Sequence, residues 1–447
     1  MSGAVSTSGP ESLDDDISPR FTPRQALAES SRCLFCYDAP CVRACPTGID
    51  IPGFIRRIAN GHATGAAHTI MEENIFGGTC ARVCPTEVLC EEKCVMNEGE
   101  QRPISIGRLQ RFATDALMEE AAATKAPHPF TRAPSTGKKV AVVGAGPASL
   151  SAAHRLAMLG HEVAVFEAKP KAGGLNEYGI AAYKMVNDFA RKEAKFILGI
   201  GGIKIHYGKA LGRGVKLHEL SVKYDAVFIG VGLGNTRDLS IAGEQLKGVG
   251  DAVDFIERLR QRKTLGAPKV GKRVVVIGGG NTAIDAAIQS KLLGADEVVM
   301  AYRRGPEQMS ATGYEQQLAK SSGVVVRDWL APKKIKGPSK GKDAGKVTAV
   351  EFVRTKLDAK GKLVETKETV TIACDMVLKA VGQTMIEETL AGLELKNGKI
   401  AVNKDFATSL KGIFAGGDCV KSGEDLTVQA VQDGKLAAHA IDRFLKG

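Results

Sequence analysis

Two segments of the chain repeat the same order of apolar and polar stretches. In each, a short run of β-branched residues leads into a glycine turn, an Ala-rich stretch with helical periodicity, and a second short apolar run. The first repeat covers residues 139–166 and the second covers residues 273–302. Strand, glycine turn, helix and strand in this order form the first half of a dinucleotide-binding fold. The pattern therefore predicts two such domains.

The chain before and after these repeats has a different texture. Residues 1–24 are rich in Ser, Asp, Gly and Pro, which predicts a flexible lead-in. Residues 51–73 and 106–123 carry helical periodicity, and a strand at 412–415 and a helix entered at Thr427 are expected near the end. The basic, Gly-rich stretch 333–346 predicts a surface loop.

Composition excludes several classes of protein. Hydrophobic residues make up 44% of the chain, yet no stretch reaches the roughly 18 apolar residues that a membrane span needs. No signal peptide is visible, so we expect a cytoplasmic protein. The net charge of +11 predicts a solvated basic surface, or attraction to a phosphate-bearing cofactor or acidic partner. Aromatic residues are only 5%, which argues against a nucleic-acid binder.

Eight of the ten cysteines lie close together in the first quarter of the chain. Their spacing is Cys33-x2-Cys36-x4-Cys41-x3-Cys45-Pro, then Cys80-x3-Cys84-Pro and Cys90-x3-Cys94. Thiolates at short spacing followed by proline are typical of [4Fe–4S] clusters, and the last cysteine of one group often binds the other cluster. Eight cysteines are enough for two clusters, and the spacing leaves their partition open.

Zinc and buried free thiols are the alternatives for these cysteines. Zinc ribbons normally use separated Cys-x2-Cys pairs, and the chain has one such pair. The spacing therefore favours iron–sulfur chemistry. Cys374 and Cys419 stand alone in apolar surroundings and are expected to be ordinary buried thiols.

The first glycine turn is followed by an acidic residue at the ribose-reading position. Glycines let the backbone approach a pyrophosphate, and the next helix directs its N-terminal amides at it. Glu167 closes the second strand, where a carboxylate accepts hydrogen bonds from ribose hydroxyls. An acid at this position favours FAD or NAD over NADPH. The turn consists of Gly144, Ala145, Gly146, Pro147, Ala148 and Ser149.

The second glycine turn is followed by basic residues instead. The strand after it ends in Tyr302, Arg303 and Arg304, and two guanidiniums there would bind a 2′-phosphate. This favours NADPH over NADH; the alternative is that both arginines are solvated surface charges. The turn consists of Gly278, Gly279, Gly280, Asn281, Thr282 and Ala283.

A third turn, Gly416-Gly417-Asp418, precedes the last predicted helix. A carboxylate there would bind a ribityl hydroxyl, and a helix N-terminus at Thr427 would face negative charge on a reduced flavin. The alternative is a simple left-handed turn in which the Asp side chain hydrogen-bonds to the backbone.

Taken together, these residues resemble the electron-input half of dihydropyrimidine dehydrogenase, either the N-terminal part of the single-chain enzyme or the small subunit of the bacterial two-subunit form. The β subunit of glutamate synthase shares the architecture, but Asp-Ala-Pro-Cys41 and Gly-Arg-Leu-Gln110 look more like the pyrimidine enzyme. Further segments that carry the resemblance are Gly78-Thr-Cys80-Ala-Arg-Val-Cys84-Pro-Thr, residues 144–150, Phe352-Val-Arg-Thr355 and Phe414-Ala-Gly-Gly-Asp418.

The resemblance implies an α/β protein with an N-terminal α-helical iron–sulfur domain and two nested Rossmann-like dinucleotide-binding domains. The expected division is a lead-in (1–24), a two-cluster helical domain (25–134), an FAD domain in two parts (135–255 and 381–447) and an NAD(P)H domain between them (256–380). One cluster would be held by Cys33, Cys36, Cys41 and Cys94. The other would be held by Cys45, Cys84, Cys90 and Gln110, with Cys80 as a bystander.

The resemblance also implies the nucleotide contacts. FAD would lie against Gly144, Gly146, Pro147, Ala148, Ser149, Leu150, Glu167, Gly174, Leu175, Lys184, Gly417, Asp418 and Thr427. NADPH would use residues 278–283, Arg303, Arg304, Ala380, Val381 and Gly382. Two positions depart from the family: Lys184 replaces a flavin-side arginine, and Ser310 replaces a third arginine near the 2′-phosphate. NADH is therefore the alternative donor.

The expected activity is a hydride transfer from NADPH to FAD, followed by electron passage through the clusters to a partner that reduces uracil or thymine. The cofactors carry this chemistry, so no catalytic nucleophile or acid–base pair is expected. The partner would be a catalytic subunit with FMN and iron–sulfur clusters, in a hetero-oligomer without nucleic acid or membrane. The alternatives are an electron-input subunit of glutamate synthase and a non-catalytic metal-binding scaffold.

Overall fold

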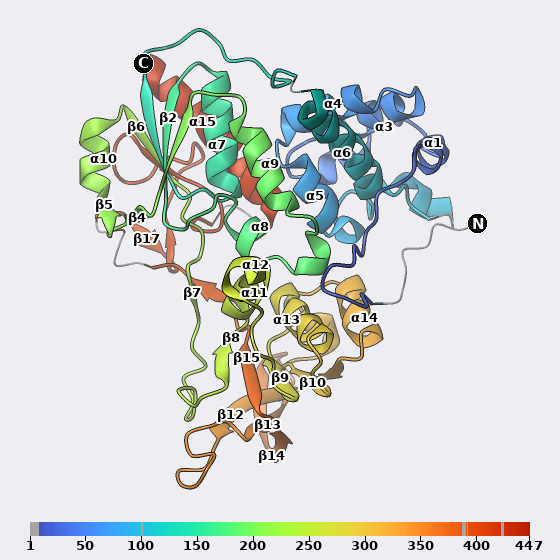
Figure 1. Ribbon diagram of the computed structural model, residues 1–447, viewed down its shortest axis with the longest axis vertical. Helices are drawn as coiled ribbons and strands as arrows, with labels where there is room; N and C mark the ends of the chain where they lie inside the picture. The colour runs from blue at the N-terminus through green and yellow to red at the C-terminus, as the bar shows by residue number, and fades with distance from the viewer. Residues whose placement is uncertain (1–8, 100–101, 125, 387–389, 391, 422–423) are drawn as a thin grey trace. The chain divides into compact units, whose positions relative to one another are not determined.

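The computed structural model describes residues 9–99, 102–124, 126–386, 390, 392–421 and 424–447, which form two compact units (Figure 1). The smaller unit comprises residues 9–17, 178–187 and 235–384. The larger unit comprises residues 18–177, 188–234 and the described part of 385–447. Residues 1–8 of the predicted lead-in lie outside the described residues.

The first part of the larger unit is helical, as its periodicity predicts. The side chains of Thr22 and Gln25 form a capping box at the start of α1, and Asp50 caps α3 by accepting a hydrogen bond from Gly53 N at 2.9 Å. The apolar faces of α3, α4 and α6 form the core of this part. Its helices are α1 (Pro23–Ser30), α2 (Pro40–Ala44), α3 (Ile51–Ala59), α4 (Ala63–Glu73), α5 (Gly77–Val83) and α6 (Ile106–Thr124), with 3₁₀ turns η1 (Thr86–Val88) and η2 (Val95–Gly99).

The rest of the larger unit is built on a five-stranded parallel sheet in the order β19-β6-β1-β2-β3. Helices cover both faces of such sheets, which explains why β1 and β6 are almost wholly apolar. Helices α7 and α15 lie side by side (Figure 1). The elements are β1 (Lys139–Val143), α7 (Pro147–Met158), β2 (Glu162–Glu167), α9 (Phe189–Leu198), β3 (Ile203–Tyr207), β6 (Ala226–Ile229), β19 (Ile413–Ala415) and α15 (Thr427–Lys446).

The smaller unit contains a second five-stranded parallel sheet, in the order β11-β10-β9-β15-β8, and an antiparallel sheet β12-β13-β14. The prediction of a loop over 333–346 is wrong for its first part. Residues 333–336 belong to β12, and residues 334–336 pair with β13. The elements are β8 (Val249–Asp251), α11 (Ala252–Arg260), α12 (Arg262–Leu265), β9 (Arg273–Ile277), α13 (Asn281–Leu292), β10 (Glu297–Ala301), α14 (Gly313–Ser321), β11 (Val325–Arg327), β12 (Leu330–Lys336), β13 (Ala349–Leu357), β14 (Leu363–Ala373) and β15 (Met376–Lys379).

No helix in the described ranges is long and apolar enough to cross a membrane. Short elements complete both units. The short elements are α8 (Leu175–Tyr178), η3 (Ala182–Lys184), β4 (Ala210–Leu211), β5 (Gly214–Val215), α10 (Leu217–Lys223), β7 (Asn235–Thr236), η4 (Pro306–Gln308), β16 (Gln383–Thr384), β17 (Leu395–Lys396) and β18 (Lys399–Ile400).

Residues 178–187 belong to the smaller unit although the chain on either side belongs to the larger one. The fully buried Tyr183 donates a hydrogen bond from its hydroxyl to Asp285 Oδ1 at 2.9 Å, and Ala182 N donates to Gln289 Oε1 at 3.0 Å. Both acceptors lie on α13. The segment is therefore part of the structure of the smaller unit and not a free connection.

Candidate functional site

The first glycine turn lies between β1 and α7, at the carboxyl end of the larger unit's sheet. Gly144 has a φ of +93°, and a Cβ there would lie 2.6 Å from Gly230 O. Gly174 has a φ of +55°, and its Cβ would lie 2.7 Å from Gly146 Cα. Side chains are excluded at these positions, so backbone amides and the α7 N-terminus are what the turn can offer to a pyrophosphate.

Glu167 stands at the end of β2 beside this turn. Its carboxylate accepts hydrogen bonds from Ala145 N and Lys169 N, both at 2.7 Å, and it is buried. Burial raises the pKa of Glu167 in opposition to these two bonds. Each carboxylate oxygen has a further lone pair, so Glu167 can bind a ribose hydroxyl while it holds the turn.

The other residues predicted around this turn have different environments. The buried Ser149 hydroxyl donates to Gly230 O at 3.2 Å, and the Leu150 side chain is fully buried, so both side chains support the turn from inside. Pro147 and Ala148 form the first turn of α7, and Leu175 begins α8. These five residues therefore shape the site and present mainly backbone to it.

The third turn lies in the same unit, after β19. Gly417 has a φ of +78°, and its N–H donates to Asp433 Oδ2 at 2.9 Å. The Thr427 hydroxyl, in the first turn of α15, donates to Asn176 Oδ1 at 2.9 Å. Asn176 Nδ2 is buried and has no hydrogen-bond partner among the described residues. Asn176 was not among the residues predicted for this site, although its position directly after Gly173-Gly174-Leu175 was a usable signal.

Burial, and then the nearby Asp425 carboxylate, raise the pKa of Asp418 to about 6. Because this pKa is above the unfolded value, the contribution of Asp418 to stability is present at low pH and is lost as the pH rises through 6. We expect Asp418→Asn to stabilise the flavin-free protein by about 1–2 kcal/mol at pH 8 and to have no effect at pH 4. Urea unfolding midpoints at both pH values would measure this, with Asp405→Asn, at a half-exposed carboxylate that pairs with Arg443, as control. Equal midpoints for Asp418→Asn and the unsubstituted chain at pH 8 would contradict it.

Lys184 lies in the smaller unit, in the returning segment. Its ammonium pairs with Asp285 at 2.8 Å and with Glu315 at 2.6 Å, and it is buried. Burial opposes the charge, but the two carboxylates outweigh it and raise the pKa of Lys184. Within this unit, its ammonium is therefore committed to two carboxylates.

The second glycine turn lies between β9 and α13 of the smaller unit. Gly278 has a φ of +150°, and a Cβ there would lie 2.3 Å from Ala380 O. Ala380, Val381 and Gly382 follow β15, which pairs with β9, so this predicted stretch does lie beside the turn. Asn281 begins α13, and its Oδ1 is buried without a hydrogen-bond partner among the described residues. The predicted turn also includes Gly279, Gly280, Thr282 and the buried Ala283.

Arg303 and Arg304 follow β10 and line an open hollow of about 630 Å³. The opposite wall is the turn between β13 and β14, which brings in Lys362. The remaining lining residues, Gln308, Leu357, Gly361 and Leu363, carry no negative charge. The hollow therefore suits a phosphate. Lys362 could not be identified from sequence, because it lies 58 residues beyond Arg304 and only the hairpin brings it there.

The first cysteine set lies together in the helical part of the larger unit. A small hollow there is lined by Cys33, Cys36, Cys41 and Cys94, with apolar residues such as Ile55 and Ile106 around them. Burial, together with neighbouring thiols, raises the pKa of Cys41 to about 11. Bare thiolates are thus disfavoured here, and cationic iron would offset that cost.

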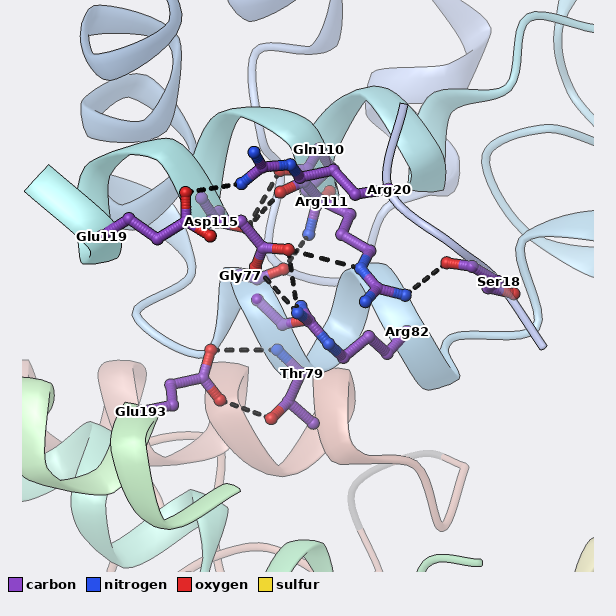
Figure 2. Close-up of polar contacts among 12 residues, drawn as sticks. Ser18, Arg20, Gly77, Thr79, Arg82, Gln110, Arg111, Asp115, Glu119 and Glu193 are labelled. Carbon is purple, nitrogen blue, oxygen red and sulfur yellow. Dashed lines mark hydrogen bonds and ion pairs between the residues drawn. The ribbon is translucent and has the colours of Figure 1, made fainter. Parts of the chain in front are cut away.

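The second cysteine set is also brought together. A hydrogen bond to Cys80, burial and the nearby Cys90 and Cys45 raise the pKa of Cys84 far above its usual value. Gln110 lies on α6, which packs against α5, and its Nε2 donates to Gly77 O at 2.7 Å (Figure 2). Cys80 thus contacts Cys84 directly, whereas Gln110 reaches the start of α5 at Gly77.

No three or more His, Cys, Asp or Glu side chains within the described ranges are grouped closely enough to hold a single metal ion. A cubane of four irons is larger than one ion and holds its four ligands farther apart. Four cysteines that line one hollow are the kind of ligand set that [4Fe–4S] clusters use. The isolated Cys374 and Cys419 are fully buried.

Comparisons with known proteins agree with this arrangement. Residues 11–122 match the family model for dihydropyrimidine dehydrogenase domain II, 4Fe-4S cluster, and residues 138–434 match that for pyridine nucleotide-disulphide oxidoreductases. The NAD-dependent dihydropyrimidine dehydrogenase subunit PreT of Escherichia coli K12 is 36% identical over 97% of both chains. The glutamate synthase [NADPH] small chain of the same organism is 34% identical over 96% of this chain and 94% of its own.

Solved structures show the same fold. Mycobacterium tuberculosis FprA in complex with NADPH superimposes with a TM-score of 0.59 and 22% identity, over 70% of this chain and 85% of its own. Thioredoxin reductase from T. acidophilum superimposes with a TM-score of 0.51 and 24% identity, over 68% of this chain and 98% of its own. The predicted α/β dinucleotide-binding architecture with an N-terminal iron–sulfur domain is thereby confirmed.

Proposed function

Because the chain belongs to the family of dihydropyrimidine dehydrogenase electron-input subunits, which are NAD(P)H-dependent flavin and iron–sulfur oxidoreductases, we propose that it oxidises NADPH and delivers the electrons to a pyrimidine-reducing partner. The observation that carries this proposal is the contrast between the two nucleotide turns. Glu167 hydrogen-bonds to the first turn, whereas Arg303 and Arg304 line a hollow at the end of the strand that follows the second turn. Such a pair suits a flavin dinucleotide in one unit and a 2′-phosphorylated dinucleotide in the other.

FAD would be held by the larger unit. The amides of the first glycine turn and α7 would bind its pyrophosphate, Glu167 its ribose and Asp418 its ribityl chain. The unpartnered Nδ2 of Asn176 would donate a further hydrogen bond. The N-terminus of α15, at Thr427, would favour negative charge near it. Lys184 stays a prediction of the family resemblance, since its ammonium already has two partners.

NADPH would be held by the smaller unit. The amides of residues 279–283 would bind the pyrophosphate, and residues 380–382 would support the turn from β15. Arg303, Arg304 and Lys362 would bind the 2′-phosphate through charge-assisted hydrogen bonds. When bound, these cofactors would supply the chemistry: FAD accepts a hydride, with its two electrons, and the clusters carry electrons singly.

Two [4Fe–4S] clusters would be held in the helical part of the larger unit. Cys33, Cys36, Cys41 and Cys94 would hold the first, since all four line one hollow. Cys45, Cys84 and Cys90 would hold the second, with either Gln110 or Cys80 as the fourth ligand. Gln110 is suitable because its amide nitrogen is fixed on Gly77, which leaves Oε1 as the atom that can bind iron.

The donor is tested by removing the two arginines. We expect Arg303→Gln/Arg304→Gln to raise the KM for NADPH about a hundredfold, because two charge-assisted bonds are lost, while the KM for NADH stays within about twofold. Lys362→Gln alone should raise the KM for NADPH about fivefold. Steady-state reduction of an artificial acceptor would measure this, and Arg213→Gln, an exposed residue of the larger unit, is the control.

The opposite outcome is equally informative. If NADH is preferred by the unsubstituted chain and the variants change neither KM, the hollow at Arg303 and Arg304 is not a 2′-phosphate site. The chain would then match the name of its NAD-dependent relatives.

The partner is proposed to be an FMN- and iron–sulfur-containing catalytic subunit that reduces uracil and thymine to their 5,6-dihydro forms. The 36% identity to dihydropyrimidine dehydrogenase subunits supports it. The 34% identity to a glutamate synthase small chain supports an amidotransferase-bearing partner as the second candidate. Affinity purification from the native, cytoplasmic extract would separate the two. A uracil-dependent oxidation of NADPH in the purified complex supports the first, and a glutamine-dependent one the second.

A further inference from the structure

Helix α5 carries Cys80 and ends directly before Cys84, and it lies against α9, a helix that flanks the five-stranded sheet of the same unit. Thr79 N donates to Glu193 Oε1 at 2.9 Å, and the Thr79 hydroxyl donates to Glu193 Oε2 (Figure 2). Both residues are completely buried. Thr79, directly before Cys80, is therefore held to α9 by both oxygens of one carboxylate.

The fit around this carboxylate is close. A Cβ on Gly78 would lie 2.5 Å from Phe189 Cζ and 2.7 Å from Glu193 Oε1, so a side chain there would displace α5 from α9. The Arg82 guanidinium lies over the Phe189 ring at 3.4 Å from its centroid. Phe189 and Glu193 are one helical turn apart and thus present one face of α9 to α5.

The other side of α5 is held by α6. Arg82 forms a two-pronged ion pair with Asp115 at 2.8 and 2.9 Å, and Gln110 Nε2 donates to Gly77 O (Figure 2). These contacts lie within the cysteine-bearing part. Glu193 differs from them because it comes from the part of the unit that carries the first glycine turn.

Helix α9 connects this contact to that turn. Ala194 and Ile197 pack in one core with Leu150 and Ala153 of α7, and α7 begins at the turn. Burying a carboxylate costs free energy that apolar packing would not. Burial raises the pKa of Glu193 to about 7 even though Thr79 and Arg82 oppose the rise. The buried carboxylate thus costs free energy at this position, and in return it forms two directional hydrogen bonds with Thr79.

We propose that Glu193 is a positioning residue that fixes α5, and with it Cys80 and the adjoining Cys84, relative to the flavin-binding part of the unit. It thereby sets how fast electrons leave the flavin for the second cluster. This inference rests on the proposed function, because it requires FAD and the clusters to be bound in that unit. Glu193 is not among the residues proposed to hold FAD or a cluster. Its effect is transmitted through Thr79 to α5.

The test separates reduction of the flavin from reduction of the clusters. In anaerobic stopped-flow experiments on holoprotein mixed with NADPH or NADH, we expect flavin bleaching in Glu193→Ala and Thr79→Val to occur at the unsubstituted rate. Cluster bleaching should be slower by about tenfold, in the range of couplings between connected sites. Glu193→Gln and Thr79→Ser keep a hydrogen-bonding partner and should recover most of the rate. Hydrogen exchange of the α5 amides provides a readout without turnover and should become faster in the two disruptive variants.

Each contrary result has a distinct meaning. Cluster bleaching at the unsubstituted rate in iron-replete Glu193→Ala would overturn the inference while leaving the proposed function intact. Loss of iron from both variants would also overturn it, because the contact would then hold the cluster in place without setting the rate. If clusters in the unsubstituted protein are reduced by dithionite but by neither nucleotide, the proposed function itself fails.

Discussion

Cys94→Ala protein purified without air is expected to retain about half of its iron and all of its flavin. Cys94 is one of the four cysteines that line a single hollow, and it is almost completely buried. Losing it leaves three half-buried thiols without the fourth ligand that would complete the cluster's ligand set. The second cysteine set lies in separate contacts around Cys84 and should keep its iron.

Iron and flavin per chain, with an EPR spectrum of the dithionite-reduced protein, would measure this effect. Cys374→Ala is a matched control, because Cys374 is also fully buried and burial raises its pKa to about 12. Unchanged iron in Cys94→Ala, or equal losses in both variants, would contradict the assignment. Stoichiometric zinc in the unsubstituted protein would replace the cluster assignment with a zinc site.

Gly434→Val is expected to destabilise the larger unit by about 3 kcal/mol or more and to release its flavin. Gly434 lies in α15 where this helix crosses α7, and a Cβ there would lie 2.0 Å from Ala148 O. The obstacle is backbone in the first turn of α7, so a rotamer change cannot relieve the clash. Displacing that turn also displaces the amides proposed to bind the FAD pyrophosphate.

Gly313→Ala provides the comparison. Gly313 is also helical, has no atom within 4 Å of its added Cβ, and should tolerate alanine with unchanged or slightly higher stability. Urea unfolding followed by flavin release and by circular dichroism would compare the two variants. A Gly434→Val protein that binds flavin with unchanged stability would mean that α15 and α7 separate easily.

Local patterns predicted the parts of the structure that depend on local sequence. The two strand–turn–helix–strand repeats are confirmed within two residues, because β-branched runs, glycine turns and Ala-rich stretches each favour one conformation. The strand at 412–415 and the helix entered at Thr427 are confirmed for the same reason.

Long-range packing decided what sequence could not reveal. Asn176 lies 251 residues before Thr427, and nothing in the sequence indicated that these two side chains would form a hydrogen bond. Lys184 lies only 17 residues after Glu167, yet it belongs to the smaller unit and pairs there with Asp285 and Glu315. The family resemblance implied a flavin contact, whereas the returning segment gives the ammonium two carboxylate partners.

The order of strands in the larger unit also constrains how the protein is made. β19 and α15 pack on elements that leave the ribosome more than 180 residues earlier, among them β6 and α7. Until residues 413–446 have emerged, the sheet lacks an edge strand and α7 lacks its main covering helix. Nascent chains thus expose apolar surface through most of the synthesis of these residues, and the flavin site proposed at the start of α7 is incomplete until residues 413–446 have emerged.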